Sequence, residues 1–390
     1  MQPTFTIHKT TSHGRLGTIS TMHGDFHTPG FFFCATSAAL RLLTTDQAKQ
    51  LHTQGILCNT YHLMDQADTI AHFGGLHTFL NWNQPIMSDS GGFQIFSLGH
   101  GTVADEIKRR QSNKQSFIHS LNQDSVTFRN IKNGSLQTLT PYKAIQIQRK
   151  LGSDLIFVLD ECTPFNVSKE YVHKSLQLTK RWAELCLEEF TLAPTHQGLY
   201  GIVQGSVYPD LRLESIAHLN SLPFFGYGIG GSLGAHRNDM IDVLSVCANQ
   251  LVPTRPVHLL GIGKIQDIIT CVPFGIDTFD CVHPTRIARH GSALAPRHLW
   301  ECVNGQWREH IVLSNAKHRL DQTPIDSNCS CSTCLNYSKG YIHHLLMKKE
   351  PLYIHLLSVH NVFFMNKFME ELRAALRCNT WKAFEDAWKV

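Results

Sequence analysis

The sequence lacks any run of eighteen or more apolar residues, although 42% of its 390 residues are hydrophobic. A transmembrane helix needs about 20 such residues in a row, so we expect no membrane span. The N-terminal segment MQPTFTIHKT also lacks the continuous apolar stretch of a secretory signal peptide. These absences argue against the membrane and exported classes and predict a cytoplasmic protein.

The sequence also has little excess charge of either sign. Its formal net charge is +4 and its isoelectric point is about 8.4. A dedicated nucleic-acid-binding domain usually carries a stronger basic signature. Any site for a polyanion must therefore be local, because no basic field covers the whole surface.

Cysteines are scattered singly, except for one tight group near the C-terminus. In a chain without an export signal this distribution predicts reduced thiols plus a metal site, and argues against a disulfide framework. The group CSCSTC holds Cys329, Cys331 and Cys334. Three thiolates and one imidazole form a closed, structural zinc site; the alternative is three buried free thiols. The spacing does not select the histidine among four candidates: His343, His344, His355 and His360.

Eight short apolar runs recur along the first 290 or so residues, with helix-length segments between them. Runs without strict alternation are typical of strands buried on both faces of a parallel sheet. One intervening segment has Thr140 as N-cap, Pro141 at the first helical position and Gly152 as its stop. Eight βα units predict a (β/α)8 TIM barrel. The runs are 31–36, 55–60, 85–90, 155–160, 199–205, 226–231, 257–263 and 278–282.

One interval does not fit the βα pattern. About 91–139 includes a stretch in which apolar and polar residues alternate, and it contains Asn133-Gly134, a strong signal for a type I′ hairpin turn. We expect an antiparallel hairpin insertion over one mouth of the barrel. The pattern changes again after about residue 310. The predicted parts are a catalytic barrel over 1–310, a zinc-binding subdomain over 311–365 and a C-terminal helix packed on the barrel over 366–390.

Polar residues and glycines stand where the predicted strands end. In a barrel these ends converge on one face, which carries the active site. A single aspartate there is often only a helix N-cap, but so many such positions in register predict a pocket that reads a planar polar ring. Glycines let the backbone approach a ligand closely. The positions are Asn59, Asp89, Asp160, Gln204, Gly230, Gly231, Gly261 and Asp280.

The segment FDCVHPTRIARHG places Arg286 and Arg289 shortly after the aspartate of the last predicted strand. Such a segment can be an ordinary solvated turn. Because it follows a predicted active-site strand, it is also compatible with an active site in which the aspartate attacks a substrate and the two arginines bind a polyanion.

Several motifs occur together in one order: SDSGGFQ, DECTPF, IVQG, GIGG, DCVHPTR and the cysteine group followed by histidine. Together they resemble the tRNA-guanine transglycosylases of the queuine pathway, over nearly the whole chain. The resemblance implies an enzyme that exchanges guanine at wobble position 34 of G-U-N tRNAs (Asp, Asn, His, Tyr) for a 7-deazaguanine. It also implies a homodimer, the tRNA anticodon loop as partner and one structural Zn2+ per subunit, with His360 as its fourth ligand.

The resemblance further implies a role for each site residue. Asp280 would be the nucleophile that attacks the ribose and forms a covalent intermediate. Asp89 would be the general acid/base. The implied base-binding residues are Asp89, Phe93, Asp160, Gln204, Gly230, Gly231 and Leu260, and the implied tRNA-binding residues are Arg286 and Arg289.

The chain departs from the bacterial pattern in the loop after Gly230-Gly231. Bacterial members usually have a glutamate there that senses the aminomethyl group of their substrate, whereas here the first acid is Asp239. Phe93 also stands where a tyrosine is usual. We therefore favour queuine as the incoming base, and 7-aminomethyl-7-deazaguanine remains the alternative.

Two other classes of protein would share part of this pattern. A non-catalytic accessory subunit would keep the barrel and the zinc site but lose catalytic acids, and both Asp89 and Asp280 are present. A different barrel hydrolase with paired carboxylates would not require the cysteine group or the two arginines.

Overall fold

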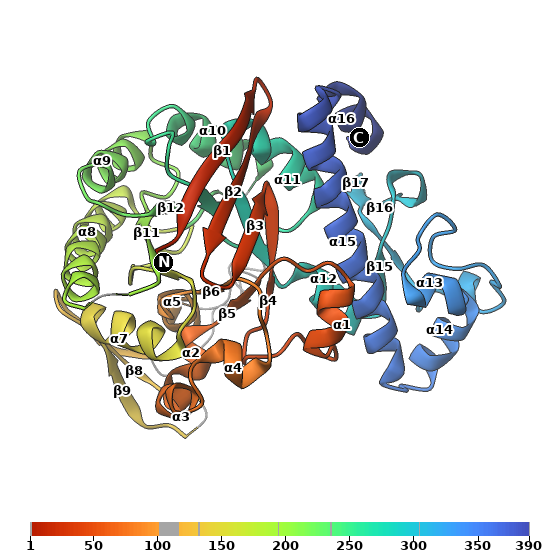
Figure 1. The fold of residues 1–390 in the computed structure, drawn as a ribbon, viewed down its shortest axis with the longest axis horizontal. Helices are drawn as coiled ribbons and strands as arrows, with labels where there is room; N and C mark the ends of the chain where they lie inside the picture. Colours follow the sequence, from red (N-terminus) through yellow and green to blue (C-terminus); the bar gives the residue numbers. More distant parts are fainter. Residues whose placement is uncertain are drawn as a thin grey trace. The chain divides into compact units, whose positions relative to one another are not determined.

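Eight parallel strands close into a barrel in the computed structural model, which confirms the predicted (β/α)8 fold (Figure 1). The strands follow one another around the barrel in their order along the chain. Each predicted apolar run overlaps one strand. The structure describes residues 2–100, 117–131, 133–193, 195–234, 236–303 and 305–389. The barrel strands are β4 Gly30–Cys34, β5 Ile56–Cys58, β6 Ile86–Ser88, β10 Leu155–Phe157, β11 Gly198–Val203, β12 Gly226–Ile229, β13 Val257–Leu259 and β14 Thr278–Cys281.

The chain divides into two compact units. The first comprises Met1–Thr6, Thr18–Asp25 and Leu57–Leu260, and the second comprises Ile7–Gly17, Phe26–Ile56 and Gly261–Val390. Among the described residues, every helix is too short or too polar to span a bilayer.

In the first unit, helices α7, α8, α9 and α10 follow one another along the outside of the barrel strands (Figure 1). The strands between them are apolar on both faces and fully buried, as expected for a parallel sheet covered by helices. The helices of this unit are α2 Thr60–Leu63, η1 Met64–Gln66, α3 Ala67–His72, α4 Leu76–Leu80, α5 Gly92–His100, α7 Pro141–Leu151, α8 Lys169–Thr191, α9 Pro209–Asn220 and α10 Arg237–Ala248.

Helix α7 begins and ends where the sequence predicts. The Thr140 hydroxyl accepts a hydrogen bond from the Lys143 N–H, and Pro141 occupies the first turn. Gly152 ends the helix with a φ of 68°, a left-handed conformation that glycine adopts without steric cost.

The predicted antiparallel insertion is present in the first unit. It is a three-stranded sheet of β7 Ile118–Leu121, β8 Val126–Arg129 and β9 Leu136–Leu139. The connection between β8 and β9 is longer than the two-residue turn that Asn133-Gly134 suggests. It covers residues 130–135 and is closed by a hydrogen bond from the Asn130 N–H to the Ser135 carbonyl. Residues 101–116 of the predicted insertion lie outside the described residues.

The second unit is organised around the long helix α15, Leu352–Cys378, which packs against α12, β15, α13 and α14 (Figure 1). The Arg373 guanidinium donates to the Pro29 carbonyl just before β4, so this helix packs beside β4. The predicted division at 365/366 stays a prediction, and α15 runs through it without a break. The other elements are α1 Thr45–Gln50, α11 Ile265–Cys271, η2 Val272–Phe274, α12 His283–Arg289, β15 Ser292–Leu294, η3 Arg297–Leu299, β16 Glu301–Val303, β17 Gln306–Arg308, β18 His310–Val312, η4 Ala316–His318, α13 Ser332–Asn336, α14 Lys339–Met347 and α16 Trp381–Trp388.

A three-stranded sheet of β1 Thr4–Thr11, β2 Gly14–Thr21 and β3 Gly24–Thr28 precedes the barrel and was not predicted. Within the second unit, Arg15 of β2 makes a two-pronged ion pair with the buried Asp277, with N–O distances of 2.8 and 2.5 Å. Asp277 stands directly before β14. A bidentate pair of this kind fixes geometry as well as charge, so it attaches β2 to the start of the strand that carries Asp280.

Within the first unit, Asp154 stands before β10 and is buried among three donors. Its carboxylate lies 2.7 Å from His23 Nδ1 and 3.1 Å from His77 Nε2, and it accepts the Ile86 N–H at 2.8 Å. Burial by itself raises the pKa of this carboxyl, but the hydrogen bonds from the two histidines outweigh burial, and the pKa lies below its ordinary value. Asp154 therefore joins the start of β10 to the segment around His23.

The substitution Asp154→Asn should lower the free energy of unfolding at pH 7 by about 3–5 kcal/mol, because it breaks a buried charged cluster. The pKa is lower in the folded than in the unfolded chain, so this stabilisation is complete above about pH 4 and is lost as the pH falls through the folded pKa. Thermal melting between pH 3 and 7 measures both effects. The control Asp68→Asn removes an exposed pair with Lys150 and should cost less than about 1 kcal/mol. Equal losses in the two variants would contradict the assignment.

Candidate active site

Asp89 follows β6 at the end of the strand, and its carboxylate is held by the end of the neighbouring strand β5. One oxygen accepts the Thr60 N–H at 2.8 Å and the Gly91 N–H at 3.2 Å, and the other accepts from the Asn59 amide at 2.5 Å. The Thr60 hydroxyl also donates to the Asp89 carbonyl. These hydrogen bonds fix the orientation of the half-buried Asp89 carboxyl group.

Asp160 and Gln204 meet at the ends of the adjacent strands β10 and β11. The Gln204 side-chain amide donates to the Asp160 carboxylate at 2.6 Å, and Asp160 is 6% exposed. Burial raises the pKa of Asp160 to about 6, although the Gln204 bond opposes this rise. The Gln204 Oε1 is buried and accepts no hydrogen bond from the described residues. An unpaired buried acceptor beside a carboxylate suits a ligand that brings its own donors.

Gly231 is required next to Gln204. Its φ is +71°, and a Cβ at this position would lie 2.1 Å from the Gln204 Oε1. The Gly231 backbone can therefore approach the amide only without a side chain. Leu260 follows β13 and Phe93 lies in α5, where 49% of its surface is exposed. Both offer apolar surface at the strand ends of the first unit.

Asp280 is the third residue of β14, and it is 8% exposed. One carboxylate oxygen accepts the Gly261 N–H at 2.8 Å, and the other receives the weaker Cys34 thiol donor at 3.6 Å. Gly261 has a φ of +77°, which favours glycine at this position. Asp280 is thus oriented by contacts to both of its carboxylate oxygens.

The two predicted arginines lie in α12, directly after this strand. Arg286 is exposed, and Arg289 is partly buried. Burial lowers the pKa of Arg289, and so do the positive charges of Arg41 and Arg286. Arg41 could not be assigned to this group from the sequence, because it lies more than 240 positions away from both other arginines. Three like charges gathered together indicate a site for an anion.

The cysteine group and His360 come together in the buried part of the second unit. The His360 Nδ1 lies 3.7, 3.6 and 3.3 Å from the sulfur atoms of Cys329, Cys331 and Cys334. Tetrahedral zinc with ordinary bond lengths separates its sulfur and nitrogen ligands by roughly 3.5 Å. The His360 Nε2 bonds to the Leu294 carbonyl at 2.8 Å, the kind of outer contact that orients a metal-binding histidine. These four residues can hold a metal ion.

The neighbouring Asn361 connects this cluster to α12. Its amide donates to the Pro284 carbonyl at 2.9 Å and to the Ser292 carbonyl at 3.2 Å, and its oxygen accepts the Leu294 N–H at 2.8 Å. One turn of α15 therefore carries both the metal-binding histidine and the group that fixes the start of the arginine-bearing helix.

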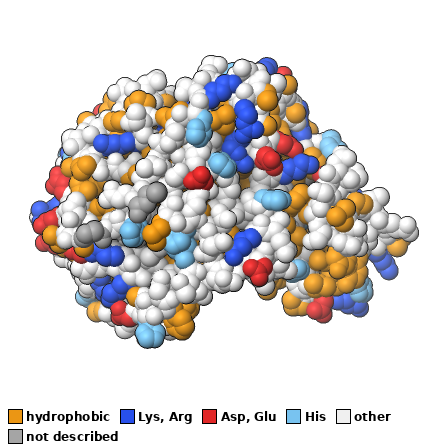
Figure 2. Space-filling model, viewed as in Figure 1, with side chains coloured by type: hydrophobic (Ala, Val, Ile, Leu, Met, Phe, Trp, Pro, Cys, Tyr) orange, Lys and Arg blue, Asp and Glu red, His pale blue; other side chains and the backbone are white. Residues whose placement is uncertain are grey.

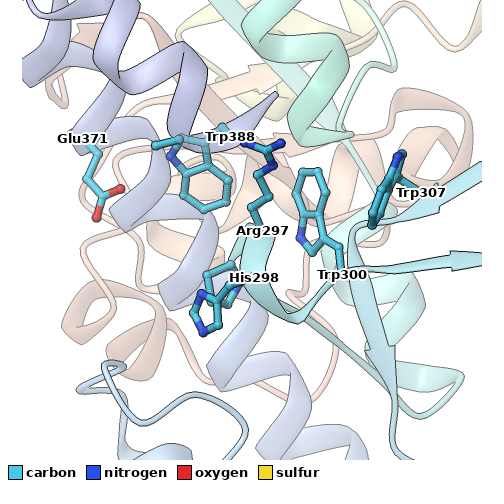
Figure 3. Close-up of a pocket in the computed structure, with 8 residues that line it drawn as sticks. Arg297, His298, Trp300, Trp307, Glu371 and Trp388 are labelled. Carbon is cyan, nitrogen blue, oxygen red and sulfur yellow. The ribbon is translucent and has the colours of Figure 1, made fainter. Parts of the chain in front are cut away.

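A cavity of about 690 Å3 in the second unit contains none of the predicted site residues (Figure 3). Trp300, Trp307 and Trp388 line it together with Arg297 and Glu371. Arg297 is already held by the Asp386 carbonyl. Because the lining supplies a single carboxylate and no nucleophile, the chemistry is better sought at the strand ends.

The fold and these positions define a class of protein. It is a (β/α)8-barrel enzyme that carries aspartates at the carboxyl ends of its strands, which share one rim in a closed parallel barrel, and it has a separate Cys3His site.

Comparison with known proteins identifies the family. The family model described as queuine tRNA-ribosyltransferase matches residues 10–389. A queuine tRNA-ribosyltransferase of Roseiflexus sp. (strain RS-1) is 41% identical over 94% of this chain and 93% of its own. One of Staphylococcus aureus (strain JH9) is 41% identical over 94% and 90%, and a putative one of Archaeoglobus fulgidus is 38% identical over 98% of both chains. The chain belongs to the queuine tRNA-ribosyltransferase family. It is a tRNA-guanine transglycosylase, a pentosyltransferase.

The structure adds residues that the sequence did not single out. The Cys34 thiol donates to the Asp280 carboxylate, and the Thr60 N–H donates to the Asp89 carboxylate. Neither residue could be assigned to the site from the sequence, because a cysteine or threonine after an apolar run is common in any buried strand. The catalytic, base-binding and tRNA-binding residues named from the sequence all lie at the strand ends or in the elements that directly follow them.

Proposed function

We propose that the enzyme exchanges guanine at position 34 of G-U-N tRNAs (Asp, Asn, His, Tyr) for a 7-deazaguanine through a covalent ribosyl–Asp280 intermediate. The observation that carries this proposal is the position of Asp280 at the end of β14. One of its carboxylate oxygens accepts the Gly261 N–H at 2.8 Å and the other accepts from the Cys34 thiol at 3.6 Å, and α12 with its two arginines follows directly.

An oxygen of the Asp280 carboxylate is the attacking atom. It forms a bond to the ribose anomeric carbon while the bond from that carbon to guanine N9 breaks, and the electron pair leaves with the base. Asp89 begins this step protonated, gives its proton to the departing guanine and becomes a carboxylate. The incoming base then attacks the same carbon, displaces Asp280 and gives its N–H proton to Asp89. Two inversions retain the configuration of the sugar.

Base recognition follows from the donors and acceptors in the first unit. Above about pH 6 the Asp160 carboxylate accepts hydrogen bonds from the N1–H and exocyclic amine of a guanine-like ring. The Gln204 amide and the Gly231 N–H donate to the ring carbonyl, with Gly230 completing the loop, and Phe93 and Leu260 cover the ring faces. Adenine presents the reverse pattern and would leave the buried Asp160 unpaired, which costs more than a lost methylene.

The arginine cluster supplies the contact with tRNA. Arg286 and Arg289, together with Arg41, would hold phosphates of the anticodon loop. Proteins that read RNA act mainly on unstacked loop bases, and the target base must leave the stack to reach a pocket.

The substitution Asp280→Asn should abolish covalent capture of tRNA, because the amide is a poor nucleophile, and should lower guanine exchange on the order of 10^4-fold. Denaturing gel electrophoresis of enzyme mixed with a G-U-N tRNA reports the adduct. The control Cys302→Ser changes an exposed cysteine and should leave both the adduct and the exchange rate as in the wild type. An adduct that persists in Asp280→Asn would place the nucleophile elsewhere.

We infer that queuine is the preferred incoming base. The first acid after Gly231 is Asp239, and its carboxylate accepts the His236 N–H at 2.9 Å as part of the capping box of α10. That acid is therefore engaged at a helix start, which disfavours it as a partner for an aminomethyl ammonium. The loop between them holds the small residues Ser232 and Gly234 on either side of Leu233; Ala235 lies outside the described residues.

The preference can be measured by chasing labelled guanine out of a G-U-N tRNA with queuine and with 7-aminomethyl-7-deazaguanine in parallel. Queuine should release the label at least tenfold faster at equal concentration, because Asp239, the first acid after Gly231, is engaged at the start of α10 and does not compensate the ammonium of the other base. Faster release by the aminomethyl base would contradict the assignment of the loop, while leaving the exchange reaction itself in place.

We also propose that the Cys3His site holds one structural zinc ion and that the enzyme is a homodimer. A closed set of four protein ligands leaves no position for water, which is the mark of a structural site. Apolar side chains gather on the surface over α13 and α14 (Figure 2). The exposed members include Leu335, Tyr341 and Met347. An exposed apolar group of this kind beside the metal site fits a second copy of the chain.

Native mass spectrometry reads both properties at once, and the expected species has two chains and two zinc ions. Cys331→Ser should lose zinc, because three ligands do not close the site. Met347→Lys should release zinc-loaded monomers, because it places a charge in the apolar contact. A wild-type monomer at micromolar concentration would contradict the dimer, and a metal-free wild type would contradict the zinc site.

A further inference from the structure

Arg212 is a fully buried arginine in α9 that no sequence motif singled out. Its guanidinium donates four hydrogen bonds, and every acceptor is a backbone carbonyl. The Nε donates to Ser206 at 2.8 Å, Nη1 to Val203 at 2.7 Å and to Gly230 at 2.9 Å, and Nη2 to Ser232 at 3.1 Å.

The four acceptor carbonyls belong to residues on either side of Gln204 and of Gly231, two of the predicted base-binding residues. Val203 and Ser206 stand on either side of Gln204 in the loop after β11. Gly230 and Ser232 stand on either side of Gly231 in the loop after β12. A single planar guanidinium therefore ties the two loops together at the place where each presents its recognition group.

The loop around Gln204 does not adopt an ordinary conformation by itself. Gly205 has a φ of +129° and Ser206 a φ of 52°, so two successive residues lie in a region that L-residues avoid. A Cβ at Gly205 would lie 2.7 Å from the Arg212 backbone nitrogen. The loop is thus wrapped tightly around the start of α9, and the bond from Arg212 to the Ser206 carbonyl helps to hold the strained residues.

A second side chain of the same helix fixes Gln204 directly. The Ser215 hydroxyl accepts the Gln204 N–H at 3.1 Å, and Ser215 is buried. Positions 212 and 215 are three apart and share one face of the helix. That face therefore holds Gln204 from its own N–H and from the carbonyls on either side of it.

Only arginine suits position 212. Burial lowers the pKa of Arg212, so the charge is costly to bury and is retained because its donors are satisfied. The guanidinium offers five donors in a fixed fork, whereas lysine is a compact point charge with three donors on a single atom. A lysine could not reach both loops in this geometry.

We propose that Arg212 and Ser215 are positioning residues for base recognition. They act through the backbone, and they set the spacing between the Gln204 amide and the Gly231 N–H to which a ring carbonyl would bind. The proposal rests on the proposed reading of the base by Gln204 and Gly231.

The test uses the full-length enzyme and guanine as the probe. Calorimetry gives the dissociation constant of guanine, and incorporation of labelled guanine into a G-U-N tRNA gives KM and kcat. Arg212→Lys should weaken guanine binding at least tenfold and raise KM by a similar factor, while kcat changes less than about twofold, because the lost interaction acts in both ground and transition state. Ser215→Ala removes one hydrogen bond and should weaken binding by roughly 2–10-fold. If Arg212→Lys does not fold, the guanine affinity of Ser215→Ala tests the proposal instead.

The matched control is Arg255→Lys. Arg255 donates to the Leu222 carbonyl at 2.9 Å and to the Tyr227 hydroxyl at 3.2 Å, near the start of β12 and away from Gly231. It should lower the melting temperature without changing guanine affinity. Wild-type affinity in Arg212→Lys and Ser215→Ala, or an equal weakening in Arg255→Lys, would overturn the positioning role. A wild-type enzyme that exchanges no guanine would instead overturn the proposed function.

Discussion

A carboxylate at the end of a buried parallel strand loses much of its water, so neighbouring groups must supply the hydrogen bonds that water gave it. The barrel meets this constraint in the same way three times. Asp89 is held from the end of β5, Asp160 from the end of β11, and Asp280 from Gly261 in the loop after β13. In each case the donor follows the adjacent strand, so the strand order of the barrel also determines which acid is held by which loop.

The three acids differ because their donors differ. Asp89 receives N–H donors on both oxygens. Asp160 receives one amide in a dry site, and its pKa rises to about 6. Asp280 accepts a backbone N–H on one oxygen and a thiol on the other. The roles that we propose for these acids, in proton transfer, base recognition and nucleophilic attack, thus fall on one residue type in three different surroundings.

Backbone carbonyls and amides carry much of this organisation. The guanidinium of Arg212 binds four carbonyls, and Asn361 binds two carbonyls and an N–H beside α12. Neither side chain is one of the predicted site residues. Each lies on a helix and fixes the conformation of a segment that carries predicted site residues. In the second unit, the helix that offers His360 to the metal site is also the helix that secures the arginine-bearing segment through the next residue.

Much of the fold was evident from the sequence, because it depends on local patterns. Eight apolar runs became eight strands, and Thr140, Pro141 and Gly152 defined α7, since caps and buried strands are encoded by neighbouring residues. Three cysteines marked the metal site by spacing, although His360 required the family resemblance. Tertiary structure alone decided the rest. The contacts of Asp280 with Cys34, of Asp154 with His23 and of Arg15 with Asp277 join residues that are far apart in the chain. Arg212 left no signal at all, because its partners are backbone carbonyls, which every residue has; only the folded chain determines which of them converge.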